Sequence, residues 1–467
     1  MFSLSPDDIE QIDRTSLRIL SELGVRVDDA KLREQALAAG AKKGRDNETI
    51  RLSSKMVREY VAMAPVSARF ADCRGRVDTL AVGSRPTFWT GAALNYIVGK
   101  QCRPIGITDL AEFTRIADSL DTVFAVVGTS IEEVRPQARD FVGFRIMAEN
   151  TGKHLRPVLY STAGVEPIIE MAKIIADGRT LTECPLVSFG YSCLSPLHWS
   201  QIAIDLWRNS AGHKLPVMLN GEPIAGATSP VTLSASIALS NAEILAGIVL
   251  VQLLEPGRPV VHNLGFAHVA EMRTAMCLSG SAECALMAYA GAKLAAYYNL
   301  PCASWMDTDS FTEDQQASLE KVLTGFAHVL GSVNIIWGMG QLDSHKALSP
   351  VQLVIDDEIV RGLLRFREGF GIDEENLAFD VICDVVTKGG DFLSHKHTLA
   401  HFRDELSESA LLVRSSRESW QAAGSTTLGQ RAGAYVKKIL QQEPAAHLTD
   451  MQRRDILAIE KRYLKAD

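Results

Sequence analysis

The chain has 467 residues, a net charge of -8 and a hydrophobic fraction of 46%. This composition is typical of one compact globular protein, because no low-complexity, Gly/Ser-rich or single-sign charge run marks a flexible linker. The acidic balance, without a basic stripe, argues against nucleic acid as a partner, and the eight cysteines, scattered without a Cys-x-x-Cys pair, argue against a disulfide framework.

The N-terminal segment, residues 1–85, is predicted to be a helical cap. Ser5 can act as the N-cap of a first helix and Pro6 occupies its first position, where the missing amide hydrogen leaves no bond unmade. The beginning of the chain carries no basic cluster of the kind that opens a secretory signal peptide. We therefore expect a cytoplasmic protein.

Short β-branched or aromatic runs follow at intervals of roughly 30 to 40 residues, which is room for a strand, a loop and a helix that crosses to the next parallel strand. Most of the runs begin on proline, which the first residue of a strand tolerates. The eight runs are 86–90, 123–127, 157–161, 185–190, 216–220, 259–263, 301–307 and 333–338. They predict an α/β fold, a (β/α)8 TIM barrel over residues 86–348, with a C-terminal helical extension over residues 349–467 packed on it.

Residues 231–254 form the one stretch that is long and apolar enough to span a bilayer. Glu243 and several small polar residues interrupt it, a turn precedes it, and Glu255, Pro256 and Gly257 end it before a strand. We interpret it as a packed helix of the barrel, so no membrane is expected as a partner.

The residues that leave the predicted strands should meet at one mouth, because the chemistry of such barrels sits at the carboxyl ends of the strands. No lysine lies in any of the eight runs, the first run has no His-x-His pair, and no Gly-x-Ser-x-Gly elbow occurs. These absences argue against a Schiff-base aldolase, a binuclear hydrolase and a serine nucleophile. The side chains that remain are aromatic, amide and acidic.

Aromatic faces with a nearby carboxylate suit a quaternary ammonium ligand. Trp305 and Asp307 should share one face of their strand while Met306 takes the other. Each tryptophan has core packing as its alternative role, and Asp309 could cap the next helix. The predicted catalytic residues are Asp307 and His345, and the predicted substrate-binding residues are Trp89, Tyr96, Asn220, Glu222, Trp305, Asp309 and Trp337.

Two further patterns could indicate other kinds of site, one for a metal and one for a phosphate. His395, His397 and His401 have a spacing that could hold a metal on one helix face, but no carboxylate or cysteine completes a ligand set close by, so we expect no metal site. Gly338 and Gly340, in the loop before His345, could instead cradle a phosphate, as loops after the seventh and eighth strands often do.

Three sequence blocks resemble a known family: NGEPIAGATSPVTL at 220–233, NAEILAG at 241–247, and Asp309-Ser310 with Asp314-x-Gln316-Ala317-x-x-Glu320-Lys321. On these blocks the chain is similar to the cobalamin-dependent trimethylamine methyltransferase family, in its branch without pyrrolysine. The similarity covers about residues 15 to 455. It implies a (β/α)8 barrel that moves a methyl group from a methylamine to Co(I) of a separate corrinoid-binding protein, without holding cobalamin tightly.

The resemblance also implies a substrate class and roles for the site. Trimethylamine-specific members carry pyrrolysine at the mouth, at a position we expect near Asp307 or His345, and this chain has none. Members without pyrrolysine imply a quaternary amine such as glycine betaine or carnitine. Trp89, Trp305 and Trp337 would then form the cage, Asp307 the counter-charge, and His345 with Asn220 would orient a substrate carboxylate or the corrinoid face.

Two other functions stay open at this point. One is a protein that binds quaternary amines without methyl transfer, and the other is a barrel enzyme that acts on a phosphorylated metabolite through the glycine loop at 338–340. A homo-oligomer is also left open.

Overall fold

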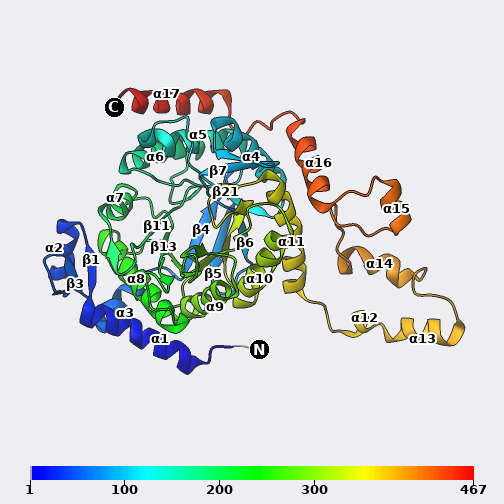
Figure 1. Cartoon of the computed structure of the whole chain (residues 1–467), viewed down its shortest axis with the longest axis horizontal. Helices are drawn as coiled ribbons and strands as arrows, with labels where there is room; N and C mark the ends of the chain where they lie inside the picture. Colours follow the sequence, from blue (N-terminus) through cyan, green and yellow to red (C-terminus); the bar gives the residue numbers. More distant parts are fainter. Residues whose placement is uncertain (1–2, 467) are drawn as a thin grey trace.

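The computed structural model describes residues 3–466 and contains a ring of parallel strands surrounded by helices (Figure 1). The strands are β6 (Thr87–Thr90), β9 (Val123–Val127), β10 (His154–Arg156), β11 (Phe189–Ser192), β13 (Val217–Asn220), β15 (Val260–Asn263), β18 (Cys302–Trp305) and β19 (Ile335–Met339). Their order is β10-β9-β6-β19-β18-β15-β13-β11, and a parallel bridge between Leu155 and Val187 joins the two ends. The predicted α/β barrel is confirmed.

The helices of the ring alternate with these strands. They are α4 (Ile107–Ser119), α5 (Arg139–Asn150), α6 (Val165–Ile175), α7 (Gln201–Asn209), α8 (Leu233–Leu254), α9 (Ala282–Tyr297), α10 (Gln315–Gly331) and α11 (Pro350–Glu368). The helix α11, which completes the ring after β19, begins beyond residue 348, where we placed the end of the barrel.

Two strands differ from their predictions. The predicted third strand at 157–161 is a loop, and the fourth strand, predicted at 185–190, begins only at Phe189. The third strand, β10, ends where the predicted run 157–161 begins. Pro157 has no amide hydrogen, so the ladder stops at Arg156, whose carbonyl accepts from Gly128 N at 2.8 Å. After it, the buried Asp140 carboxylate accepts from the amides of Tyr160 and Ser161 at 3.0 and 3.1 Å, which holds that stretch as a loop.

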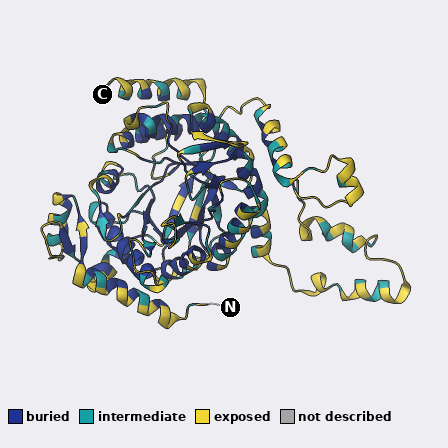
Figure 2. Ribbon diagram, viewed as in Figure 1, coloured by how far each residue is buried: buried dark blue, intermediate teal, exposed yellow. Residues whose placement is uncertain are grey.

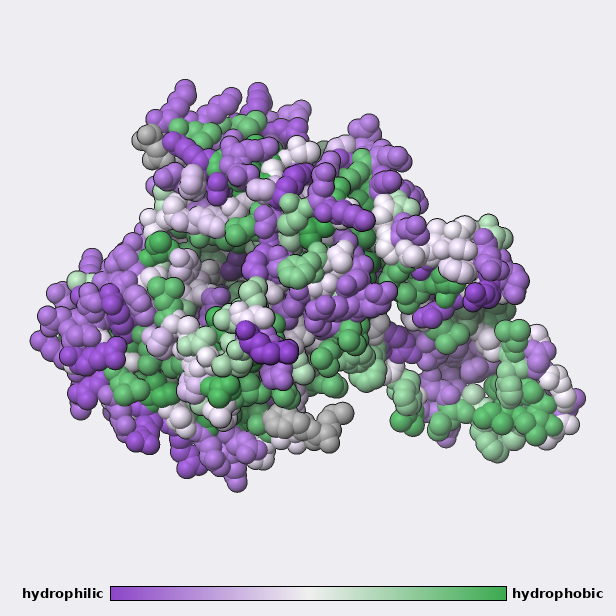
Figure 3. Space-filling model, in the orientation of Figure 1, coloured by the Kyte–Doolittle hydropathy of each residue, from purple (hydrophilic) through white to green (hydrophobic). Residues whose placement is uncertain are grey.

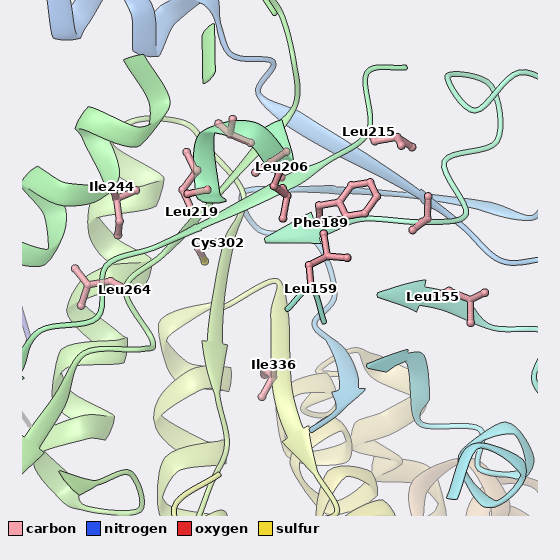
Figure 4. Packing of buried hydrophobic residues seen from close by; sticks show 14 of the residues in the cluster. Leu155, Leu159, Phe189, Leu206, Leu215, Leu219, Ile244, Leu264, Cys302 and Ile336 are labelled. Atoms are coloured by element: carbon pink, nitrogen blue, oxygen red, sulfur yellow. The ribbon is translucent and has the colours of Figure 1, made fainter. Parts of the chain in front are cut away.

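Alternate strand residues face the barrel interior and the helix layer, as the period of a strand requires. Ala303, Trp305, Ile335 and Trp337 belong to the interior cluster. Met306 belongs to the layer between strands and helices, which confirms its predicted orientation. Figure 4 shows part of that outer layer, where Leu155, Phe189, Leu219 and Ile336 are buried.

The described part of the N-terminal segment contains the expected helices and, in addition, five short strands. Its helices are α1 (Pro6–Arg18), α2 (Ala30–Ala38) and α3 (Ser54–Met63), and its strands are β1 (Val25–Val27), β2 (Lys42–Lys43), β3 (Thr49–Arg51), β4 (Ser67–Ala71) and β5 (Val77–Ala81). Ser5 caps α1 and Pro6 opens it, as predicted.

The hairpin β4–β5 closes the N-terminal end of the barrel. Phe70 and Leu80 are 0% and 3% exposed and join the interior cluster with Trp89. The carbonyl of Ala71 lies 2.9 Å from His154 Nδ1 at the start of β10, and that of Ala81 accepts from Asn334 Nδ2 at 2.7 Å just before β19. An open barrel end would expose apolar side chains to water, and the hairpin removes that exposure.

Helix α8 is the segment whose apolar length suggested a membrane span. It is the one described helix that is long and apolar enough for that purpose, and 89% of its most hydrophobic window is buried within the protein. Asn241 and Glu243 are both 0% exposed and hydrogen-bonded. The prediction of a packed barrel helix is confirmed.

The C-terminal extension packs on the barrel only in part. Helix α16 (Leu428–Leu440) lies against α11, and α17 (Asp450–Ala466) lies against α5 and α6. Between α11 and α16 the chain forms a projecting arm (Figures 1 and 2), and none of its four described helices contains a buried residue: α12 (Glu374–Leu377), α13 (Phe379–Lys388), α14 (Lys396–Glu405) and α15 (Arg417–Ala422). Figure 3 shows apolar side chains gathered on this arm, since short amphipathic helices there have no barrel surface to cover.

We predict that Phe70→Ala lowers the free energy of unfolding by about 3–5 kcal/mol, because it opens a cavity inside the barrel end. Phe379→Ala on the arm, where the side chain is 71% exposed, is the matched control and should cost less than about 0.5 kcal/mol. Urea unfolding followed by tryptophan fluorescence measures both. Equal effects of the two substitutions would contradict the role of the hairpin as a buried plug.

Candidate functional site

The end of β19 is anchored by a buried ion pair. Lys321 Nζ lies 2.7 Å from Asp356 Oδ2, and both side chains are fully buried. Lys321 also donates to the carbonyl of Gly338 at 2.8 Å, and Asp356 accepts from Gly340 N at 2.7 Å. These bonds fix the glycine loop to α10 and α11, so the next residues leave the barrel in one direction.

Three consecutive residues after this loop adopt the left-handed conformation. Asp343, Ser344 and His345 have φ values of 56°, 47° and 69°, which residues other than glycine seldom adopt. Asp343 N and Ser344 N donate to the carbonyls of Ser310 and Thr308 at 2.8 and 3.0 Å. Such a run persists only where surrounding bonds hold it, and here it turns His345 back over the barrel mouth.

His345 meets Asp307 at the mouth. Its Nδ1 lies 2.8 Å from Asp307 Oδ2, with side-chain exposures of 22% and 0%. Burial alone would lower the pKa of His345, but the Asp307 carboxylate outweighs it and raises that pKa. Burial would likewise raise the pKa of Asp307, yet His345 lowers it. The two predicted catalytic residues therefore form an ion pair.

Several polar atoms around this pair lack a hydrogen-bond partner among the described residues. They are Asp307 Oδ1, His345 Nε2, His268 Nδ1 and His345 Nδ1, whose contact with Asp307 is an ion pair without hydrogen-bond geometry. Asp307 and His268 are 0% and 4% exposed, and an unmade hydrogen bond at a buried polar atom costs about 1–3 kcal/mol. Uncompensated groups converging on one mouth are typical of a ligand site.

Aromatic rings wall the same place. Phe266 packs edge-on against Trp305 with ring centroids 4.5 Å apart, and the rings of His268 and Trp305 each lie 5.0 Å from that of His345. Phe266 and His268 were missed from the sequence, although both follow the sixth strand closely. Loops that follow the strands face the mouth of such a barrel, so both positions could have been predicted. Our list of candidate residues ended at the last residue of this strand.

The amide and acidic residues predicted after β13 lie at the mouth as well. Asn220 Nδ2 donates to Ser192 Oγ at 3.2 Å, and its Oδ1 accepts from Asn263 Nδ2 at 2.8 Å. Burial raises the pKa of Glu222, although Ser192 and the charge of His345 oppose that shift. The charges of Glu222 and His345 thus attract each other.

Asp309 ties loops together rather than offering free oxygen atoms. Its Oδ1 accepts from Ser279 N at 2.8 Å, from Ser279 Oγ at 3.0 Å and from Ser344 Oγ at 2.7 Å, and its Oδ2 accepts from Gly280 N at 3.2 Å. Ser279 Oγ also lies 2.8 Å from Asp307 Oδ2. Asp309 therefore holds the loop of His345 next to Asp307.

Two predicted binding residues, Trp89 and Tyr96, lie away from the mouth, and a third, Trp337, is covered on one face. Trp89 is 0% exposed and packs edge-on against Phe70 at 5.5 Å, near the closed end. Tyr96 is 2% exposed and packs against Phe113 of α4, outside the ring. Trp337 lies 5.0 Å from Trp305, but a guanidinium stacks on it at 4.6 Å. The structure thus brings Trp305 to the mouth and leaves Trp89 and Tyr96 in core packing, the alternative role noted for tryptophans.

The glycine loop does not present free amides to a phosphate. The Gly340 amide already donates to Asp356, and Ser349 N donates to the Gly340 carbonyl at 2.8 Å. Within residues 3–466 no group of three or more His, Cys, Asp or Glu side chains is arranged to hold a metal. His397 and His401 lie on the projecting arm, with ring centroids 4.3 Å apart.

The chain matches the family described as trimethylamine methyltransferase (MTTB) over residues 1–464. It belongs to that family. Trimethylamine methyltransferase MttB of Desulfitobacterium hafniense is 30% identical over 436 residues, covering 92% of this chain and 87% of the relative. Glycine betaine methyltransferase from another strain of that species is 28% identical over 446 residues, covering 94% and 92%. The resemblance predicted from the sequence blocks is confirmed.

The fold of this chain is also similar to that of solved structures. The monomethylamine methyltransferase MtmB of Methanosarcina barkeri aligns with a TM-score of 0.57 and 12% identity, covering 99% of this chain and 88% of that one. At that identity the likeness concerns the fold alone. It agrees with the (β/α)8 barrel.

The family block at 314–321 has a structural use in this chain. Asp314 caps α10 by accepting from Ala317 N at 3.0 Å. Glu320 Oε2 accepts from Asp309 N at 2.8 Å and from Thr308 Oγ1 at 2.5 Å, and Lys321 anchors the glycine loop. The block therefore positions the two loops that carry Asp307 and His345.

The ion pair predicts a pH window for stability. Because the pKa of His345 is raised, its contribution is complete below its unfolded value of about 6.5 and is lost as the pH rises through the higher folded value. The lowered pKa of Asp307 makes its contribution complete above about 3.9 and lost as the pH falls. His345→Gln should therefore cost most free energy of unfolding between about pH 4.5 and 6.5.

Urea unfolding at a series of pH values measures this difference, with His401→Gln on the projecting arm as the control. A cost of His345→Gln that stays constant from mildly acidic to alkaline pH would show that the two side chains do not form an ion pair.

Proposed function

We propose that this protein is a methyltransferase that moves a methyl group from a quaternary amine to Co(I) of a separate corrinoid protein. The observation that carries the proposal is the fully buried Asp307 carboxylate, with one oxygen unpartnered, next to His345, whose ring lies against those of Trp305 and Phe266. The names of the trimethylamine and glycine betaine methyltransferases to which the chain is similar support it.

A permanent cation is the ligand that this mouth suits. Quaternary ammonium groups are attracted to aromatic faces by about 0.5–2 kcal/mol per contact, and they donate no hydrogen bond. Asp307 supplies a counter-charge in a buried place, where a charge interacts more strongly than in water. Glu222, coupled to His345, adds acidic character on the opposite side.

The chemistry needs alignment rather than proton transfer. Co(I) of the corrinoid supplies the electron pair for the new bond to the methyl carbon, while the pair of the broken C–N bond stays on nitrogen, so that a neutral tertiary amine leaves. Trp305 and Phe266 would fix the ammonium group and exclude water. Asp307 would hold the charge until it disappears, and the unpartnered Nε2 of His345 could orient an acceptor group.

The remaining partners follow from this function. The cobalamin would be carried by the partner protein and enter over the mouth, where His345 and Phe266 are partly exposed. The barrel would hold no cofactor tightly. We place the reaction in the cytoplasm, since the apolar helix α8 is packed inside the protein.

A protein that binds quaternary amines without transferring the methyl group is the second candidate. The same buried carboxylate and aromatic wall favour it, because recognition of the cation does not itself require a corrinoid. Activity separates the two candidates.

The test combines the purified protein, a Co(I) corrinoid protein and a panel of methylated amines, and follows loss of the Co(I) absorbance. We expect loss that depends on a quaternary amine, and a decrease of about 100-fold in kcat/KM for Asp307→Asn, because the cation loses a buried counter-charge. Asp343→Asn is the control: Asp343 lies in the loop of His345, but its carboxylate pairs with the half-exposed Lys346 at 3.3 Å, so its loss should change kcat/KM little.

If no amine discharges the Co(I) signal while one of them raises the melting temperature, the protein is a binding protein rather than a methyltransferase. If Asp307→Asn retains full activity, the carboxylate has no part in substrate binding.

A further inference from the structure

Arg156, the last residue of β10, is a buried cation without an acidic partner. The residue is 7% exposed. No Asp or Glu within residues 3–466 forms an ion pair with it, its Nε has no hydrogen-bond partner, and the bond from Nη1 to the carbonyl of Pro157 is long, at 3.5 Å. Burial lowers the pKa of Arg156 to about 10, so the side chain still carries its charge at neutral pH.

Arg258 shows how the same fold treats a buried arginine of structural type. It is 0% exposed, and its three nitrogens donate to the carbonyl of Leu215, the carbonyl of Trp207 and the hydroxyl of Ser210 at 2.8 to 3.0 Å. Glu255 lies 3.5 Å away as its counter-charge. Arg156 has no such counter-charge, since its described contacts are the long hydrogen bond to Pro157 and the ring of Trp337, and a buried charge without an opposite charge is strongly unfavourable.

The position of Arg156 links it to the proposed site. Its guanidinium lies over the Trp337 ring at 4.6 Å, Trp337 lies 5.0 Å from Trp305, and Trp305 lies 5.0 Å from His345. The guanidinium is therefore connected to the Asp307–His345 pair through the rings of two neighbouring tryptophans.

Space for the guanidinium is provided by a glycine on the neighbouring strand. A Cβ atom at Gly190 in β11 would lie 2.7 Å from Nη2 of Arg156 and 3.0 Å from Cβ of Met218, so the guanidinium would have to move away to make room for it. Glycine at this position thus keeps room inside the barrel for a charged side chain that no protein group neutralises.

We propose that Arg156 binds the carboxylate of the methyl donor, so that the substrate is a zwitterion that carries both a quaternary ammonium group and a carboxylate. The proposal rests on the proposed function, and it names the specificity of that same site. A guanidinium can donate two parallel hydrogen bonds to a carboxylate. The anion would satisfy Nε and remove the uncompensated charge, while the ammonium group meets the aromatic and acidic mouth.

The first test compares two probes, glycine betaine and choline, which share the trimethylammonium group and differ in the carboxylate. Isothermal titration of the full chain should show glycine betaine binding about 100-fold more tightly than choline, as for a desolvated charge pair. Arg156→Gln should abolish this preference, and Arg156→Lys should retain only part of it, because an ammonium lacks the planar fork.

A second test separates ligand binding from a structural role. Removing an unpaired buried charge should not destabilise the fold, so Arg156→Met should melt at or above the temperature of the unaltered protein and should lose the rise in melting temperature caused by glycine betaine. Arg258→Met is the control and should melt lower, since Glu255 would then be left unpaired.

Each result decides one question. An unchanged preference for glycine betaine in Arg156→Gln, no binding of either probe by the unaltered protein, or a loss of stability in Arg156→Met as large as that in Arg258→Met would overturn the proposal. Binding that depends on Arg156 without any loss of the Co(I) signal would instead overturn methyl transfer and leave the carboxylate site standing.

Discussion

The contact between His345 and Asp307 is the interaction on which the barrel mouth depends. It requires β18 and β19 to lie side by side, because each residue follows one of these strands. It also requires a left-handed turn that only the bonds to Ser310, Thr308 and neighbouring groups stabilise. The buried Lys321–Asp356 pair fixes the start of that loop. Disturbing any of these supports would separate a carboxylate from the imidazole that keeps it ionised.

Charge inside the barrel is divided between two places. Asp307 is paired with His345, while Arg156, stacked on Trp337, has no acidic partner in the part of the chain that the structure describes. Both Asp307 and Arg156 are removed from water, and a buried charge is costly unless it is compensated. A ligand with a positive and a negative end could interact with both Asp307 and Arg156. The stability lost by burying these two charges would then serve ligand binding.

Sequence reasoning predicted the barrel because its strands repeat with a strong period, and it placed Asp307 and His345 at one mouth, where they meet, because strand ends converge. It misplaced β10, since a proline that usually opens a strand here ends one. The sequence could not tell whether Trp89 and Trp337 pack in the core or line a ligand cage. For Trp89 the deciding contact is with Phe70 of the N-terminal hairpin, which is distant in the sequence. Arg156 was missed because its type and position in the sequence do not indicate a function. Only the structure shows that it is buried and has no acidic partner among the described residues.

The central claim is that the mouth recognises a permanent positive charge. The most direct measurement compares the affinity of glycine betaine with that of 3,3-dimethylbutanoate, which has the same shape and carboxylate but carbon in place of the charged nitrogen. The account predicts that glycine betaine binds at least about tenfold more tightly, from cation–π attraction and the Asp307 charge. Equal or tighter binding of the neutral-headed isostere would contradict it, because the site would then select only shape and the carboxylate.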